Sequence, residues 1–437
     1  TDVASASWVL TATLLAAGVT MPVAGRLAEI HGKKKVLVAS AAILVVGSAV
    51  VALSGTLLPV VVGRVLQGMA MGYIPVAISL VREVTPPRMT NSALAAVSAT
   101  LGVGGALGLP LAAWIVEAFD WHALFWVSSV LAGVVIIATA TMVPRGAEAH
   151  PARVDLVGAV GLTIGLVALL VGMTKGNDWG WGAAPTLALI VGGVVVLLAW
   201  GRHQLGHREP LVDLRTTARL PVLFTNLAAL MIGFGMMAQS IVVPQLLQSP
   251  VETGFGLGQT IMQTGLWMAP AGLMMLVFSP ISSAMLTRLG GRVTLAIGAS
   301  VIAAGYLLAV FMTDAPWKLM LATCLSSAGV GIGYAAMPSL ILDNVPRAEA
   351  SSGVGVNALM RSMGTTVAGA VMAIVLTSQT TGLGGALIPT HDAFRLCFVL
   401  GAGAALVAVV LTLLIPRRGV AGASATEPVA VPEPVRA

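Results

Sequence analysis

The feature of this chain that most limits its fold is a series of apolar runs that recurs over nearly its whole length. Each run holds about 20 residues, the length at which an α-helix crosses the ~30 Å hydrocarbon core of a bilayer. Only 9% of the residues are charged, whereas soluble domains average about 25%. So few charges cannot cover a surface that faces water. Lipid must therefore be the solvent, and we predict an all-α integral membrane fold.

The apolar runs are numerous enough to form a large helical bundle. We predict 13 membrane-spanning helices, joined by mostly short connections that make consecutive helices antiparallel. Their approximate ranges are 5–24, 36–54, 58–81, 92–117, 122–143, 155–174, 185–201, 221–248, 262–280, 293–312, 318–341, 352–377 and 394–415. The two cysteines, Cys324 and Cys397, both lie inside apolar runs. Neither a disulfide framework nor a metal site is therefore indicated.

The distribution of lysine and arginine orients these spans. When loops are assigned alternately to two sides, 18 of the 23 basic residues fall on one side, two on the other and three within spans. Because cytoplasmic loops carry an excess of basic residues, we predict that this side, with the C-terminus, faces the cytoplasm in the cell membrane. From the first residues we expect no signal peptide, and 13 spans would place residue 1 outside. We therefore expect one further helix upstream and fourteen in the parent protein.

The predicted spans divide into two blocks around a central pair. The expected division is an N-terminal bundle over residues 1–147, two additional spans over 148–215, a C-terminal bundle over 216–415 and a tail over 416–437. The tail is rich in Pro, Ala and Val, and we expect it to be disordered and cytoplasmic.

The stretch GRLAEIHGKKKVLV, residues 25–38, concentrates positive charge between two apolar runs and contains a single acid, Glu29. It resembles the signature loop between the second and third helices of the major facilitator superfamily, whose pattern is G-x-L-a-D-r-x-G-r-k. Glu29 stands where Asp is usual, and Ile30 where Arg is usual. The matching residues are Gly25, Leu27, Gly32, Lys33 and Lys34.

A degenerate copy of this stretch, SAMLTRLGGRVTL, lies between two spans of the second block. Gly290 matches Gly32 and Arg292 matches Lys34, while Thr287 replaces the acid. Internal repeats are typical of transporters. The resemblance implies two helix bundles related by pseudo-two-fold symmetry. The two additional central spans are similar to those of the fourteen-helix drug:proton antiporter branch (EmrB/QacA type), here lacking its first helix.

For Glu29 the resemblance implies a gating contact. The span predicted from residue 352 begins on the same side of the membrane, and a helix N-terminus favours a nearby anion. The acid is expected to bridge to that helix and hold the outward-facing state. The residues assigned to this gate are Gly25, Glu29, Gly32, Lys33, Lys34, Arg288 and Arg292. The alternative is a solvated basic loop that only anchors its helices.

Two arginines, Arg64 and Arg361, lie inside predicted spans. An intramembrane arginine costs about 2.5–3.5 kcal/mol, so it usually faces the bundle interior and has a partner. Gln67 and Asn357 lie one turn away on the same faces as Arg64 and Arg361, and we predict that both faces line a central pathway. Hydrogen bonding to helix carbonyls alone is the alternative.

Further pathway candidates come from a partial resemblance to a family motif and from spans rich in Met, Gln and Trp. The stretch GVGGALGLPLAA (102–113) resembles the antiporter motif of the family, with its proline one residue late. Methionine is flexible and suits recognition of varied apolar ligands. These candidates are Gly104, Gly108, Pro110, Gln239, Gln263, Trp267 and Tyr334.

Together these observations predict a secondary transporter, and no enzyme, that exports amphipathic small molecules in exchange for protons by alternating access. With no Walker-type loop, the proton gradient is the expected energy source, without cofactor or metal. None of the 17 acids lies mid-span, so the resemblance places the coupling Asp in the upstream helix. The expected partners are the substrate, protons and the bilayer, with no nucleic acid, around a monomer.

Three alternatives to this function remain open. The first is a narrow-specificity exporter of one metabolite or lipid. The second is an anion importer in which Arg64 and Arg361 clamp the anion. The third is a truncated product that does not transport.

Overall fold

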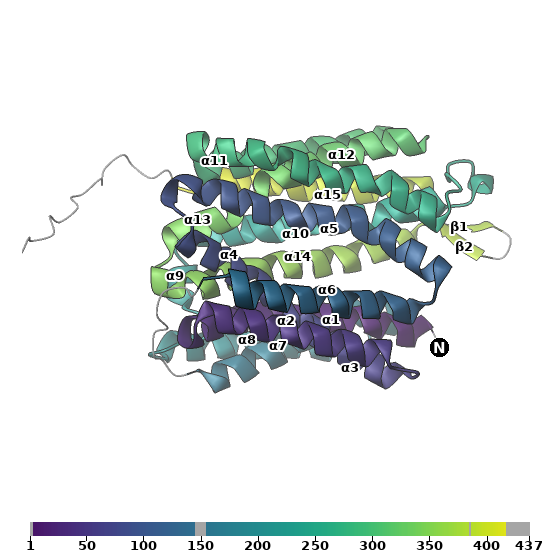
Figure 1. Cartoon of the computed structure of the whole chain (residues 1–437). Coiled ribbons are helices and arrows are strands. Elements are labelled where there is room, and N and C mark those ends of the chain that lie inside the picture. The colour runs from purple at the N-terminus through teal and green to yellow at the C-terminus, as the bar shows by residue number, and fades with distance from the viewer. Residues whose placement is uncertain (1–2, 145–153, 384–385, 417–437) are drawn as a thin grey trace, which may run out of the picture.

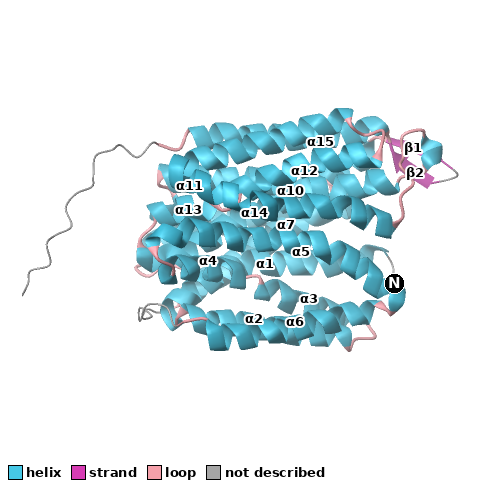
Figure 2. Cartoon of the chain, turned by 45° about the horizontal axis from the view of Figure 1, so that its top comes forward, coloured by secondary structure: helices cyan, strands magenta, loops and turns pink. Residues whose placement is uncertain are grey.

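The computed structural model describes residues 3–144, 154–383 and 386–416. Apart from one β-hairpin, this part of the chain forms helices joined by short turns (Figure 2). The helices run roughly along one axis, with α9 and α13 near one end and the hairpin near the other (Figure 1). We call the end where α1 meets α2 the basic end, because Lys33, Lys34 and Lys35 lie there.

The first block is built from α1 to α6. Its elements are α1 (Val3–His31), α2 (Lys33–Ala52), α3 (Leu57–Ala70), α4 (Tyr73–Val84), the 3-10 turn η1 (Pro87–Met89), α5 (Thr90–Ala118) and α6 (Trp121–Met142). A central pair, α7 (Leu156–Trp179) and α8 (Ala184–Gly206), follows, and the short α9 (Leu214–Thr217) leads into the second block.

The second block is built from α10 to α15. Its elements are α10 (Leu220–Gln248), η2 (Val251–Thr253), α11 (Ile261–Phe311), α12 (Pro316–Gly333), α13 (Ala336–Asn344), η3 (Arg347–Glu349), α14 (Ala350–Ser378), β1 (Thr380–Leu383), β2 (Ala386–Pro389) and α15 (His391–Leu413). The antiparallel hairpin pairs Thr380 with Pro389.

Two of the predicted continuous spans, 58–81 and 318–341, are each broken into two helices. The first breaks at Met71 and Gly72, and the second at Tyr334 and Ala335. In each case the first residue of the break lies four positions before a proline, Pro75 or Pro338. A proline ring clashes with the carbonyl four residues back and removes one helical hydrogen bond. The breaks therefore occur at equivalent places in the two blocks.

The spans predicted at 262–280 and 293–312 are joined in α11, a run of 51 residues. Gly290 interrupts it with the positive φ of 77°, a conformation that favours glycine, and so divides α11 into two helical arms. In the described residues, twelve helical segments are long and apolar enough to cross a membrane, with α11 counted once. This confirms the predicted all-α membrane fold, while the count of 13 crossings stays a prediction.

The packing separates an interior from an apolar exterior. Within the second block α10, α11, α12, α14 and α15 pack on one another, and the large core cluster lies there. The blocks touch where α1 packs on α14 and α5 on α11, and α7 contacts both α1 and α14. Large apolar side chains such as Val130, Ile137 and Leu198 are exposed, as expected of surfaces that face lipid.

Candidate functional site

The turn between α1 and α2 brings Glu29 against the second block. Gly32 has a φ of 95°, which favours glycine and lets the chain reverse directly into Lys33. Gly25, two turns before the end of α1, lies so close to α14 that a Cβ there would be 2.5 Å from the Ser351 carbonyl oxygen. The two predicted glycines thus have different functions, since one forms the turn and the other allows the helices to meet.

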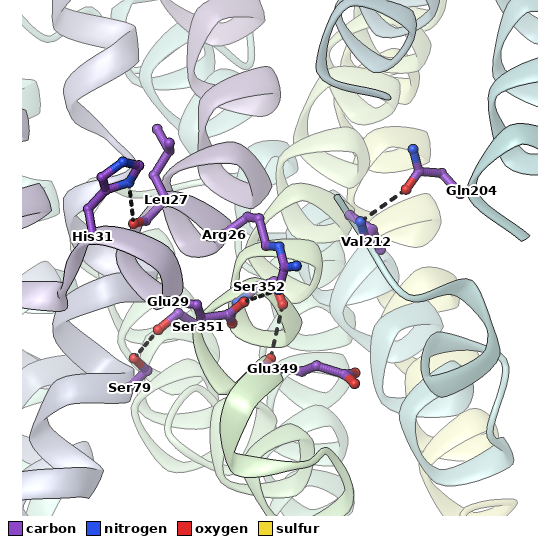
Figure 3. A network of polar contacts seen from close by, with 10 residues as sticks. All are labelled: Arg26, Leu27, Glu29, His31, Ser79, Gln204, Val212, Glu349, Ser351 and Ser352. Carbon is purple, nitrogen blue, oxygen red and sulfur yellow. Dashed lines mark hydrogen bonds and ion pairs between the residues drawn. The ribbon is translucent and has the colours of Figure 1, made fainter. Parts of the chain in front are cut away.

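Glu29 binds the first turn of α14 (Figure 3). Its Oε1 accepts a hydrogen bond of 2.8 Å from the backbone N–H of Ser352, and Arg26 Nη1 lies 3.3 Å from its Oε2. Glu29 is only 8% exposed. An N–H at a helix start has no partner inside the helix, and the helix dipole favours an anion there. A buried carboxylate therefore joins the blocks through one charge-assisted hydrogen bond, while Arg26 of its own helix balances its charge.

Further polar contacts between the blocks surround Glu29. Ser79 of α4 and Ser351 of α14 have their hydroxyl oxygens 2.5 Å apart. Arg82 of α4 forms an ion pair of 2.8 Å with Asp343 of α13. On the α5–α11 side, Asn91 donates to Thr287 at 3.2 Å, and the hydroxyls of Ser92 and Ser283 are 2.7 Å apart. The basic end is thus closed by contacts from four helix pairs, α1–α14, α4–α14, α4–α13 and α5–α11.

The other predicted gate cations bind within their own blocks. Lys33 pairs with Glu83, and Lys34 Nζ donates to the Val143 carbonyl at 2.7 Å. In the second block Arg292 donates to the carbonyl of Leu413, near the end of α15. Lys34 and Arg292 thus donate hydrogen bonds to carbonyl oxygens at equivalent helix ends. Arg288 is exposed.

The repeat is asymmetric at the position of the acid. Thr287 occupies the place in α11 that Glu29 occupies in α1, and it receives the amide of Asn91 from the start of α5. One inter-block contact is therefore charged and buried, whereas its counterpart is neutral and exposed.

A small pocket with three polar side chains in an otherwise apolar lining lies where the two helix breaks meet. Pro75 at the start of α4 lines it together with Tyr334 at the end of α12 and with Asn357 and Arg361 of α14. The Arg361 guanidinium carbon lies 4.5 Å from the centre of the Tyr334 ring. Three predicted pathway residues thus meet in one place, which we call the central pocket.

Close packing of α10 on α14 fixes the backbone beside this pocket. A Cβ at Gly233 would lie 2.1 Å from the Arg361 carbonyl oxygen, and one at Gly364 would lie 1.9 Å from that of Leu230. Asn357 donates to Asn226 of α10 at 3.0 Å, and both amides are almost fully buried. In the described structure Asn226 Nδ2 has no hydrogen-bond partner.

Arg64 and Gln67 lie apart from the central pocket. Arg64 donates to Gln67 at 3.0 Å, and Gln67 donates to Ser48 of α2 at 2.9 Å. The guanidinium also lies over the ring of Phe125 of α6, 5.5 Å from its centre. Among the described residues no contact joins Arg64 to Arg361.

Three predicted pathway residues of the second block have local hydrogen-bond partners. Gln263 forms a capping box with Thr260 at the start of α11. Trp267 donates to Gln259 at 2.9 Å, and Gln239 to Ser327 at 3.2 Å. Their part in transport stays a prediction.

The antiporter-like motif packs differently from its expected pattern. A Cβ at Gly104 or Gly108 would meet nothing within 4 Å, and Pro110 lies in contact distance of Gly265. The close contact between α5 and α11 is formed instead by Gly102, where a Cβ would lie 2.3 Å from Met275.

Sequence reasoning missed a hydrogen-bond network that joins α7, α8 and the segment before α9. Asp155 caps α7 through the Gly158 N–H at 2.7 Å and accepts from Gln204 Nε2, also at 2.7 Å. Gln204 in turn accepts from the Val212 N–H. Burial raises the pKa of Asp155, but hydrogen bonds from Gly158, Gln204 and His203 outweigh burial, so its pKa lies below the usual value. An Asp directly before an apolar run is a capping signal.

Membrane-length helices in two blocks, which meet at one end and border a pocket that contains Arg361, are typical of a multi-pass membrane transporter. The chain belongs to the Major Facilitator Superfamily, whose model matches residues 1–369 and 225–436.

Named relatives and solved structures agree with this family. A Multidrug resistance protein B homolog of Mycobacterium tuberculosis is 25% identical over 85% of this chain and 69% of its own length. The Tetracenomycin C resistance and export protein of Streptomyces glaucescens is 26% identical over 86% and 70%. The crystal structure of the human organic anion transporter MFSD10 aligns with a TM-score of 0.64, at 15% identity, over 93% of this chain and 83% of that one. The proton:xylose symporter XylE gives 0.62 at 13% identity over 94% and 86%.

Proposed function

We propose that the protein is a proton-coupled exporter of amphipathic small molecules that works by alternating access. The observation that carries this is the contact between Glu29 and Ser352. It joins two blocks of similar helix arrangement, and it lies at one end of the pathway that we expect between them. Opening of that end requires a buried carboxylate to leave a helix N-terminus. Two relatives are named for drug resistance or export, which supports export as the direction.

In this proposal the basic end faces the cytoplasm, and the conformation described is the one closed on that side. The excess of Lys and Arg at this end supports the orientation. Membership of the fourteen-helix branch is supported by the α7–α8 pair, which packs beside the seam between α1 and α14. The coupling carboxylate is proposed to lie in an upstream helix, and the working unit is proposed to be a monomer.

The gate is tested by replacing Glu29 with Gln in the full-length protein. Glutamine keeps the shape and an accepting oxygen but removes the charge that the α14 N-terminus favours. Loss of about 1 kcal/mol shifts a two-state equilibrium about fivefold, so the basic end should open more often. We expect export of ethidium, measured as its accumulation in cells without other exporters, to fall severalfold.

Two controls make this test specific. Glu29→Asp restores the residue that the family pattern carries and should keep most of the activity. Glu117→Gln removes an exposed charge from α5 and should leave export unchanged. Normal export by Glu29→Gln would refute the gate. If the parent protein changes the accumulation of no compound in a panel of amphipathic dyes, the export function itself is wrong.

A further inference from the structure

The strongest unexplained feature of the interior is the positive charge of Arg361 at the central pocket. Arg361 carries five N–H donors, and in the described structure its guanidinium lies against the face of the Tyr334 ring. No carboxylate of the described residues lies within ion-pair distance of it. An arginine inside a membrane protein usually has a partner or marks a ligand pathway.

A second polar side chain of α14, the amide of Asn357, lines the central pocket beside Arg361. Asn357 is held in place by its hydrogen bond to Asn226 of α10, and Asn226 itself lines a neighbouring pocket. Among the described residues no acid lines the central pocket to balance the charge of Arg361.

The opposite wall of the pocket is apolar. Ile74, Pro75 and Ile78 of α4 face the polar residues of α14 across it. In the closed state the pocket has room for about one water-sized group, so it must widen before the head group of a substrate can enter, and a whole substrate does not fit. The apolar body of a ligand must therefore extend beyond it.

We propose that the central pocket is a subsite for a negatively charged oxygen group of the substrate, such as a carboxylate, carried on an apolar body. Arg361 binds this group and Asn357 positions it, while α4 contacts the adjoining apolar part. A planar guanidinium matches a carboxylate with two parallel hydrogen bonds. The inference rests on the proposed function in one respect, namely that a substrate enters this pocket.

The test compares three ligands with one apolar body and different head groups. Naphthalene-2-carboxylate, naphthalene-2-carboxamide and 2-naphthylmethylammonium are titrated by calorimetry into the full chain in lipid nanodiscs, with empty nanodiscs subtracted. The carboxylate should bind most tightly, and Arg361→Gln should weaken its binding on the order of tenfold to a hundredfold. Binding of the carboxamide should change little.

Two variants guard against a folding defect. Arg361→Lys keeps the charge but loses the planar fork, so its affinity for the carboxylate should lie between wild type and Gln. Arg395→Gln removes an exposed arginine from α15 and should leave all three affinities unchanged. Equal or tighter binding of the ammonium ligand by wild type would overturn the proposal, as would a carboxylate preference that survives Arg361→Gln.

The result of the binding test can be distinguished from the result of the export test. If ethidium is exported but no head-group preference is found, the subsite is wrong and the proposed function stands. If the preference is present but no compound is exported, the subsite stands and the proposed function is wrong.

Discussion

At the scale of single residues, equivalent positions of the two blocks show which features come from the fold and which are particular to one side. Gly32 and Gly290 both have positive φ, and Lys34 and Arg292 both bind a carbonyl near a helix end. These features belong to the pair of helices and the turn that joins them, which both blocks contain. Glu29 has only Thr287 as its counterpart, so the charged contact is specific to the α1–α14 side.

Asp155 gives a pH prediction outside the membrane spans. Its pKa is lowered in the folded protein, so the carboxylate stabilises the fold above its unfolded pKa of about 3.9, and this stability is lost as pH falls through the folded pKa. Asn at position 155 can still cap α7, but it replaces the oxygen that accepts from Gln204 Nε2 with an N–H donor. Asp155→Asn should therefore lower the free energy of unfolding at pH 7 by about 1–3 kcal/mol, and with it the unfolding temperature. The difference from wild type should shrink below about pH 4.

The unfolding can be followed with a thiol-reactive dye in detergent. Cys397 is fully buried, so in a Cys324→Ser background, which removes the partly exposed second thiol, the dye reacts only when α15 becomes accessible. Asp178→Asn, which removes a half-exposed partner of Lys175 on the same helix, is the comparison at the other end of α7. If the unfolding temperatures of Asp155→Asn and wild type differ by the same amount at pH 3.5 and at pH 7, the ionised carboxylate does not stabilise the contact between α7 and α8.

At the scale of helices, some glycines lie at close helix–helix contacts and others face open space. A Cβ at Gly25 would meet the Ser351 carbonyl at 2.5 Å, whereas one at Gly104 would meet nothing within 4 Å. We expect Gly25→Ala to destabilise the closed protein by about 1–3 kcal/mol through overpacking. Gly104→Ala should be neutral or slightly stabilising, since alanine favours a helix over glycine by roughly 0.5–1 kcal/mol.

Thermal unfolding of the two variants beside wild type checks this contrast. A matched pair is needed because both changes add one methyl group to a glycine within a membrane helix. Equal unfolding temperatures for Gly25→Ala and Gly104→Ala would show that α1 and α14 are not in the close contact described.

Helix existence could be predicted from the sequence because apolar length is a local property, but helix continuity could not. Pro75 and Pro338 break their spans, while Pro22, Pro110 and Pro244 lie inside continuous helices. Proline alone does not decide between these outcomes. What the breaking prolines share is an equivalent place in the two blocks, which becomes visible only when the repeat is aligned beyond its signature loop.

The candidate site was predictable in part for a similar reason. Glu29, Tyr334, Asn357 and Arg361 are rare residue types in an apolar chain, so composition alone draws attention to them. The partners that complete their sites were not predictable, because Ser352 contributes a backbone N–H and Asn226 lies more than 100 residues before Asn357 in the chain. Gln263 shows the converse, since its amide completes a helix cap.

At the scale of the whole molecule, the two blocks form an interface whose polar contacts gather at the basic end. Those contacts come from α1, α4 and α5 on one side and from α11, α13 and α14 on the other. Alternating access requires that all of them separate together, because they close the same opening. The central claim is therefore that this end must open during every transport cycle.

The most direct measurement is a reversible cross-link across the basic end. The hydroxyls of Ser92 on α5 and Ser283 on α11 are 2.7 Å apart, so a Ser92→Cys, Ser283→Cys double variant places two thiols together, while Cys397 is buried. We predict that oxidation joins the two helices and stops ethidium export, and that reduction restores it, with neither single variant affected. Undiminished export by the fully cross-linked protein would show that the basic end does not have to open.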